Sequence, residues 1–88
     1  MDRFKDKTVI VTGAGSGIGK STAIRLDAEG AQLLIIDINE EHLHATHSLL
    51  KNEASTSHVL NIASPEETKN FFQNLENNKK KLDALVNV

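Results

Sequence analysis

Four short apolar runs alternate with three longer amphipathic stretches along the chain. The runs at residues 8–11, 32–36, 58–60 and 84–88 lack polar alternation, which is typical of strands covered on both faces. The stretches at residues 18–29, 40 to about 51, and 65 to beyond 75 are predicted helices. This alternation predicts an α/β fold with a doubly wound parallel sheet, truncated to about four strands in the order 3-2-1-4 with three helices. A ligand is expected at the switch point between strands one and four.

Local signals mark the ends of these helices. Gly30 follows the first helix, where a left-handed residue commonly closes a helix. Asn39 can cap the second helix. Ser64 is suited to the cap of the third helix and Glu67 can bond back to it as a capping box, with Pro65 at the first helical position. The buried stripe predicted for the third helix consists of Thr68, Phe71, Phe72 and Leu75.

The glycine-rich stretch TGAGSGIGKST joins the first predicted strand to the first helix. Glycines let the backbone approach a phosphate, and free N–H groups at a helix start stabilise its charge. From Ala14 the stretch matches A-x-x-x-x-G-K-S, a relaxed nucleoside-triphosphate loop that would use Lys20 and Ser21. From Gly13 it matches G-x-x-x-G-x-G, a dinucleotide-binding turn. The loop alone predicts a phosphate above residues 17–19 and leaves both interpretations open.

Two positions favour the dinucleotide. The strict triphosphate pattern begins with glycine, and Ala14 occupies that position. Asp37 ends the second predicted strand 18 residues after Gly19, close to the spacing of a carboxylate that binds a ribose diol. The alternative for Asp37 is a solvated strand end or a helix cap. The common G-x-G-x-x-G spacing is absent, and the loop is the variant with Gly13, Gly17 and Gly19.

With that variant, the chain resembles the short-chain dehydrogenase/reductase family. TGAGSGIG is similar to the family's nucleotide loop, and EGAQLLIIDIN is similar to its second-strand region. LNIAS lies where the family usually has an Asp-Val or similar pair that touches adenine, and LDALVNV resembles the approach to its N-[N/V]-A-G motif. The resemblance covers nearly all 88 residues. It implies that residues 1–88 are a single, partial NAD-binding domain of Rossmann-like fold.

The resemblance implies NAD rather than NADP as the cofactor. Asp37 would repel a 2′-phosphate, and Ser16 stands where NADP-preferring members often have a basic residue. Asn61 replaces the usual aspartate beside adenine, although its amide oxygen can still accept from the adenine amino group. The expected cofactor-binding residues are Gly13, Ser16, Gly17, Ile18, Gly19, Asp37, Ile38, Asn61, Ile62 and Asn87.

The family's catalytic groups have no counterpart in these residues. The family transfers hydride between a nicotinamide cofactor and an alcohol or carbonyl, with a tyrosine as acid or base and a lysine four residues later. Those groups would lie beyond Val88, and the chain contains no tyrosine. We therefore expect no catalytic residue and no dehydrogenase activity, and we interpret the chain as a fragment that ends inside a family motif. The alternative is a free-standing, non-enzymatic NAD-binding module; a P-loop protein that binds triphosphates is the third hypothesis.

Composition and charge exclude several other functions. The formal net charge of −2 gives no electrostatic case for binding nucleic acid or anionic membranes. The absence of cysteine removes disulfides, thiolate catalysis and cysteine-based zinc sites. No apolar run is long enough for a signal peptide or a membrane span, so a cytoplasmic location is expected. The family's usual subunit-contact helices would lie in the absent part, so any oligomer would be atypical.

Three histidines and one aspartate are the remaining polar residues of interest. His42, His44 and His47 lack a matching carboxylate or cysteine, so no metal is expected there. Asp27 falls near the predicted inward face of the first helix, where an unpaired carboxylate would be costly. We expect it either at the exposed rim or as a destabilising departure from the family pattern.

Overall fold

The computed structural model of the protein describes residues 3–78 and 81–88. Four parallel strands form one sheet in the order β3-β2-β1-β4, and they span Thr8–Thr12 (β1), Gln32–Asp37 (β2), Thr56–Val59 (β3) and Ala84–Val86 (β4). The three helices that connect them span Gly17–Ala28 (α1), Glu40–His47 (α2) and Pro65–Asn77 (α3). The predicted α/β class, the strand order and the number of helices are confirmed.

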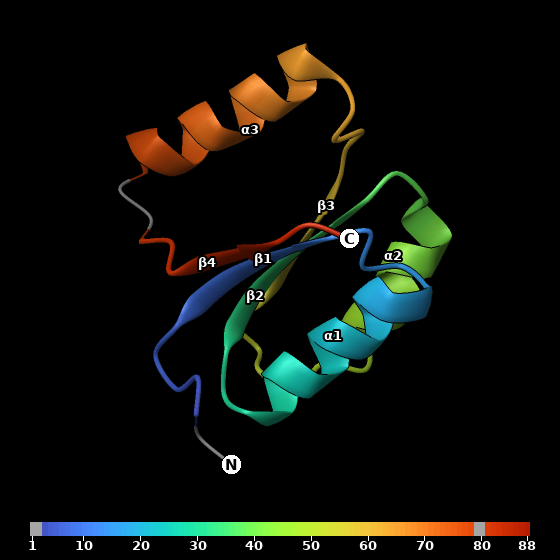
Figure 1. Cartoon of the computed structure of the whole chain (residues 1–88), viewed down its shortest axis with the longest axis vertical. Coiled ribbons are helices and arrows are strands. Elements are labelled where there is room, and N and C mark those ends of the chain that lie inside the picture. Colours follow the sequence, from blue (N-terminus) through green and yellow to red (C-terminus); the bar gives the residue numbers. More distant parts are fainter. Residues whose placement is uncertain (1–2, 79–80) are drawn as a thin grey trace.

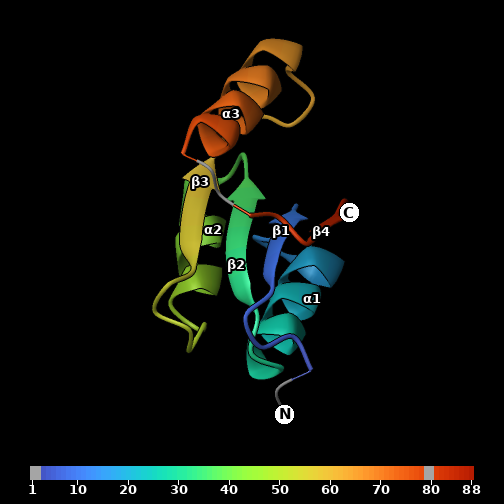
Figure 2. The ribbon, with the colours of Figure 1, turned by 90° about the vertical axis from the view of Figure 1, so that its left-hand side faces the viewer.

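The helices lie on both faces of the sheet. Helices α1 and α2 cover one face, whereas α3 lies apart from them at one end of the molecule (Figure 1 and Figure 2). On β1 and β2, successive side chains alternate between the two faces because adjacent residues of a strand point in opposite directions. The α1–α2 side of the core contains Val9, Val11, Ala14, Ala23, Ala31, Leu33, Ile35 and Leu43. The opposite side contains Ile10, Leu34, Ile36 and Leu60.

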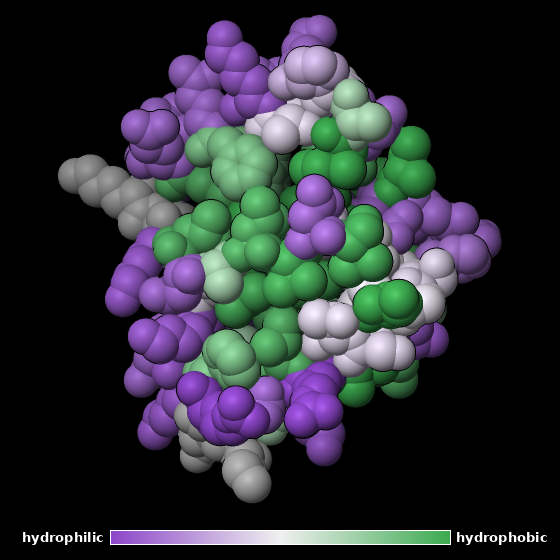
Figure 3. Space-filling view, in the orientation of Figure 1, coloured by the Kyte–Doolittle hydropathy of each residue, from purple (hydrophilic) through white to green (hydrophobic). Residues whose placement is uncertain are grey.

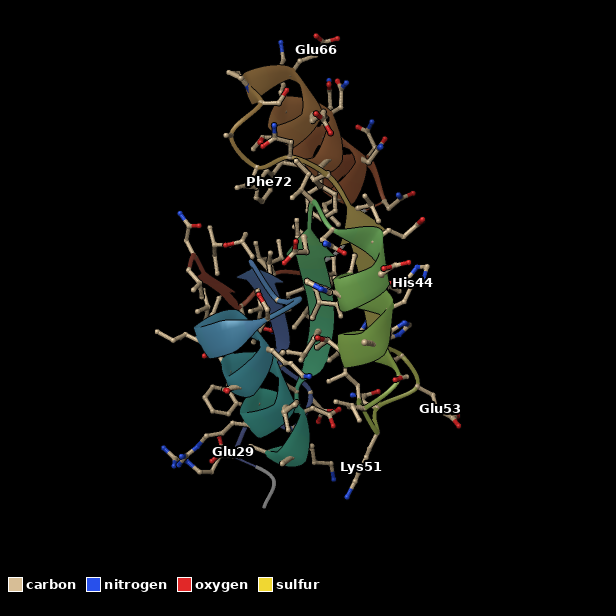
Figure 4. All side chains as sticks on the ribbon, turned by 90° about the vertical axis from the view of Figure 1, so that its right-hand side faces the viewer. Glu29, His44, Lys51, Glu53, Glu66 and Phe72 are labelled. Atoms are coloured by element: carbon tan, nitrogen blue, oxygen red, sulfur yellow. The ribbon has the colours of Figure 1, made fainter. Side chains whose placement is uncertain are left out.

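Helix α3 packs less tightly than the other two helices. Its predicted stripe faces the sheet, but no residue of α3 is fully buried, and Phe71, Phe72 and Leu75 are partly buried against the second core cluster. Glu66 points away from the sheet, whereas Phe72 lies between α3 and the strands (Figure 4). Leu85 on β4 remains 50% exposed. Hydrophobic residues gather in the middle of the face that carries β4 (Figure 3), so this face is covered only in part.

Helix α2 is shorter than predicted, because a residue of α1 holds the chain that follows it. The helix ends at His47 rather than near Lys51. The backbone N–H groups of Lys51 and Asn52 donate to the two carboxylate oxygens of Asp27, over 2.8 and 3.0 Å. Asp27 is buried with both oxygens bonded, so it is neither at an exposed rim nor unpaired.

The predicted helix caps form, with one difference. Asn39 Oδ1 accepts from the N–H of His42, and Gly30 has a φ of +95°. Ser64 Oγ accepts from the N–H of Glu67, over 3.3 Å. The Glu67 carboxylate does not return to Ser64 but accepts from the N–H of Asn61, so the capping box is only half formed.

Strand boundaries shift by one or two residues at β3 and β4. Strand β3 begins at Thr56 and ends at Val59, because pairing with β2 fixes its register from Leu34↔Thr56 to Asp37↔Val59. Strand β4 ends at Val86 rather than at the last residue. Within the described residues, no helix is long and apolar enough to cross a membrane.

Candidate functional site

The carboxyl ends of β1, β2 and β4 meet at one edge of the sheet, where the glycine-rich loop leaves β1. The end of β4 lies beside the end of β1 at this edge (Figure 1). An open depression of about 160 Å³ is lined there by Gly13, Ile36, Asp37, Ile38, Leu60, Asn61, Ile62 and Val88. Five of the predicted site residues therefore share one depression: Gly13, Asp37, Ile38, Asn61 and Ile62.

A larger depression of about 300 Å³ lies elsewhere, beside the last turns of α1. It is lined by Arg3, Phe4, Thr22, Arg25, Leu26 and Glu29, and it contains none of the predicted site residues. The size of a depression therefore does not identify the site in this chain. The site is identified instead by the glycine-rich loop, the strand ends and a carboxylate, which converge at one edge of the sheet.

The loop adopts conformations that require glycine. Gly13 and Gly17 have φ values of +63° and +57°, in the left-handed region where other residues are strained. Gly19 is needed for a different reason: a Cβ there would overlap the backbone carbonyl of Gly13. The turn therefore folds back closely on its own first residue, and α1 starts directly from it at Gly17.

Residues at the start of α1 leave backbone donors free for an anion. The first helical bond in the described chain runs from the N–H of Lys20 to the carbonyl of Ser16, over 3.3 Å. The N–H groups of residues 16–19 precede it, and no bond from them to another described residue is found. Ser16 is exposed and its side chain makes no capping bond, and Ile18 is 74% exposed. A helix start with free N–H groups favours a negatively charged ligand.

Asp37 joins the end of β2 to the loop. Its Oδ2 accepts a hydrogen bond from the N–H of Gly15 over 2.8 Å, and its Oδ1 accepts from the N–H of Asn39 over 2.9 Å. The second bond is a local turn just before α2, whose N-cap is Asn39. The first bond reaches across the site, so Asp37 is both a lining residue of the depression and a contact of the loop.

Apolar and amide side chains lie on the other side of Asp37. Ile38 is 66% exposed and Ile62 is 39% exposed, and both line the depression. Exposed isoleucines beside a depression offer an apolar surface to a flat ring. Asn61 lies with them, but its Oδ1 already accepts from the N–H of Ala63 over 3.0 Å. That oxygen keeps one lone pair for a further donor.

Asn87 directly follows β4, beside the end of β1. Its Oδ1 accepts from the Thr12 hydroxyl over 2.8 Å, and the Thr12 oxygen accepts from the N–H of Val88 over 3.2 Å. Thr12 thus fastens the end of β4 to the end of β1 at the switch point. The structure brings Asn87 to the edge that carries the loop, although Asn87 is not among the lining residues of the depression.

Three residues that organise this site were not among the predicted ones, namely Thr12, Gly15 and Thr46. Thr46 is completely buried, and its hydroxyl donates to the carbonyl of Ala14 over 2.9 Å. A signal for Thr46 exists in the sequence, because it lies three residues after Leu43 and therefore on the same buried side of α2. Its partner, however, lies 32 residues away and could be found only from the fold.

A doubly wound sheet with a glycine-rich loop after β1 and a carboxylate at the end of β2 defines a dinucleotide-binding protein. The family model for short chain dehydrogenase matches residues 7–88, and the chain belongs to this family. Its fold implies binding of a dinucleotide cofactor, which favours the dinucleotide interpretation of the loop over the triphosphate one.

Characterised relatives and solved structures agree with this assignment. A 3β-hydroxysteroid dehydrogenase of Mediterraneibacter gnavus is 33% identical over 99% of this chain and 32% of its own length. A short chain dehydrogenase of Mycobacterium smegmatis superposes with a TM-score of 0.83 at 33% identity, over all of this chain and 38% of its own. An NAD⁺-bound xylitol dehydrogenase superposes with a TM-score of 0.82 at 30% identity, over 94% of this chain and 33% of its own. The chain therefore spans about a third of the length of these proteins.

Proposed function

We propose that the chain is the NAD-binding portion of a short-chain oxidoreductase, which would transfer hydride between the nicotinamide ring and an alcohol or carbonyl substrate. One observation carries the proposal: the half-buried carboxylate of Asp37 stands at the end of β2 and lines the same depression as Gly13. A carboxylate at this position is suited to the hydroxyls of the adenosine ribose. The substrate class follows from the family alone.

The choice of NAD over NADP rests on charge. A 2′-phosphate would bring two negative groups together at Asp37, which is unfavourable at short range. The eight residues that line the depression include no lysine or arginine to offset this repulsion. Ser16, at the start of α1, also supplies no positive charge. These features support a preference for the cofactor without the 2′-phosphate.

Each predicted residue has a role in this proposal. NAD would supply the hydride acceptor, and the described residues would bind and orient it. The pyrophosphate would contact Gly13, Ser16, Gly17, Ile18 and Gly19, the ribose Asp37, the adenine Ile38, Asn61 and Ile62, and the rest of the cofactor would pass Asn87. The 88 residues contain no tyrosine for the family's proton transfer, so we propose that this chain binds the cofactor without turnover.

Fluorescence titration with NADH and NADPH tests the proposal. The reduced nicotinamide fluoresces on direct excitation, and the chain has no tryptophan whose emission would overlap the measurement. We expect NADH to bind more tightly than NADPH. Asp37→Asn should weaken NADH binding about tenfold, because it removes a charged hydrogen-bond acceptor, and should reduce the preference over NADPH.

The matched control is Asp6→Asn, a change of the same chemistry at an exposed residue that does not line the depression. It should leave both affinities unchanged. Equal binding of NADPH and NADH by the unmodified chain would contradict the NAD preference. Magnesium-dependent ATP binding that is lost in Lys20→Ala and retained in Asp37→Asn would instead establish the triphosphate interpretation.

A further inference from the structure

A single peptide unit of the glycine-rich loop is held at both of its ends by side chains. The unit joins Ala14 to Gly15. Its carbonyl accepts from the buried Thr46 hydroxyl over 2.9 Å, and its N–H donates to Asp37 Oδ2 over 2.8 Å. The two side chains come from different elements, since Asp37 ends β2 and Thr46 lies in the last turn of α2.

These two bonds fix the direction of the peptide. If the unit turned over, its carbonyl oxygen would face the Asp37 carboxylate, which is also an acceptor, and the Thr46 hydroxyl proton would lose the carbonyl that accepts it. Two facing acceptors and an unpaired hydroxyl proton would both be unfavourable in a buried setting, where unpaired polar groups cost most. The N–H of Ala14 is also bonded, to the carbonyl of Ile36 over 3.0 Å. The N–H of Ala14 and both polar groups of the Ala14–Gly15 peptide are therefore hydrogen-bonded to residues of β2 or α2.

The space around Gly15 on the side of α2 has no room for a side chain. A Cβ placed on Gly15 would lie 2.8 Å from Asp37 Oδ2 and 2.8 Å from His42 Cβ. Gly15 is itself buried. Helix α2 therefore packs against the loop. His42 lies near the start of α2, and Thr46 lies one turn later in the same helix. The free N–H groups of residues 16–19 follow this unit in the chain, so their direction depends on it.

We propose that Thr46 is a positioning residue for the cofactor: it orients the Ala14–Gly15 peptide, which in turn holds the phosphate loop and the Asp37 carboxylate in their binding arrangement. This inference rests on the proposed function for the effect on affinity, but the orientation of the peptide is independent of it. Thr46 touches the loop backbone and not the depression. Its hydroxyl, rather than its methyl group, carries the role.

Two substitutions separate the hydroxyl from the methyl group. Thr46→Val keeps the shape and removes the hydroxyl, whereas Thr46→Ser keeps the hydroxyl. The matched control is Ser55→Ala, because Ser55 is also buried and its hydroxyl also bonds one backbone group, the N–H of Leu33, at the opposite end of β2. Each ¹⁵N-labelled variant would be measured for hydrogen exchange of the Gly15 amide, relative to the amides of β1, and for its NADH affinity.

We expect the Gly15 amide to exchange about tenfold faster in Thr46→Val, and NADH affinity to fall about fivefold, which corresponds to the loss of one buried hydrogen bond. Thr46→Ser and Ser55→Ala should stay close to the unmodified chain in both measurements. An equal loss of affinity in Thr46→Ser, or in Ser55→Ala, would overturn the inference, since shape or general stability would then explain it.

Two further outcomes remain decisive. If Thr46→Val does not fold, Thr46→Ala removes the same hydroxyl without adding bulk, and the same Gly15 exchange rate is expected to rise. If the unmodified chain binds no NADH, the proposed function fails. The exchange of the Gly15 amide in the Thr46 variants still decides whether the peptide is held as described, and an unchanged rate would refute it.

Discussion

Asp83 and Thr8 hold the starts of β4 and β1 together through a reciprocal pair of hydrogen bonds. The N–H of Thr8 donates to Asp83 Oδ2 over 2.8 Å, and the N–H of Asp83 donates to the carbonyl of Thr8 over 2.9 Å. The two residues are 75 positions apart in the sequence. Because β4 has only three residues, this pair is a large part of what fixes its register against β1.

Asp83 gives the fold a dependence on acid pH. Its pKa lies below the ordinary value of 3.8, chiefly because the Thr8 N–H stabilises the carboxylate, with smaller contributions from Lys81 and Lys7. A lowered folded-state pKa contributes stability above the unfolded pKa, and this stability is lost as the pH falls through the folded pKa. We therefore expect the contribution of Asp83 to be intact above the unfolded pKa of 3.8 and to be lost as the pH falls below it.

Urea unfolding at a series of pH values checks this prediction. Asp83→Asn should be less stable than the unmodified chain at neutral pH, and the difference should shrink at acid pH, where the carboxylate is protonated. Asp6→Asn is the control, because Asp6 is exposed at the surface. A constant difference between Asp83→Asn and the unmodified chain at all pH values would show that the charge of Asp83 has no part in it.

The order of elements could be predicted from the sequence because it depends on local patterns. Short apolar runs and cap residues such as Asn39 and Ser64 act within a few positions, and the right-handed crossover then fixes the sheet order. The ends of α2 and β3 could not be predicted, because distant partners determine them. Asp27, on α1, accepts hydrogen bonds from the N–H groups of Lys51 and Asn52, which would otherwise continue the hydrogen bonding of α2.

Asp27→Ala tests this role of Asp27. The substitution leaves the N–H groups of Lys51 and Asn52 without acceptors in a partly buried setting. We expect the free energy of unfolding to fall by about 2 kcal/mol, within the range for unpaired backbone donors. Asp27→Asn should cost less, because one acceptor oxygen remains. Chemical denaturation measures both, with the exposed Glu53→Ala as a control that should change stability by less than about 0.5 kcal/mol.

A different result for these variants would revise the account of the segment after α2. If Asp27→Ala is as stable as Glu53→Ala, solvent replaces the carboxylate and Asp27 does not determine where α2 ends. If Asp27→Ala stabilises the chain, Asp27 is a destabilising departure from the family pattern.

The site itself was only partly predictable. The glycines and Asp37 follow a pattern of spacing, and the structure brings them to one edge of the sheet. Thr12 and Thr46 were missed, since each acts through a hydroxyl on a backbone group far away in the sequence. In the sequence, a threonine within a predicted strand or helix cannot be told from an ordinary residue of that element, because its hydrogen-bond partner is known only from the fold.

Thr12→Val probes the junction of β1 and β4. The variant keeps the side-chain shape but removes the acceptor for the N–H of Val88 and the donor to Asn87. We expect a loss of about 1 kcal/mol in stability and faster hydrogen exchange at the amide of Val88, whereas Thr12→Ser should preserve both. Unchanged exchange at Val88 in Thr12→Val would mean that pairing along β4 alone holds its end.

Alanine substitutions at Gly17 and Gly19 distinguish backbone strain from steric overlap in the loop. Gly17 has a φ of +57° with open space around it, so Gly17→Ala should cost about 1–2 kcal/mol in conformational strain and leave the loop path unchanged. Gly19 lies within helix α1, where alanine is favoured by about 1 kcal/mol over glycine. Its new Cβ, however, would overlap the carbonyl of Gly13, and two backbone segments cannot separate without moving the loop.

We therefore expect Gly19→Ala to be the more damaging change, both in the urea midpoint and in NADH binding, despite its better helix propensity. Amide shift changes in Gly19→Ala should spread to Gly13 and the end of β1, whereas those in Gly17→Ala should stay within the first turn of α1. If Gly19→Ala is instead more stable than the unmodified chain, helix propensity outweighs the overlap, and the loop is able to move away from α1 at little cost.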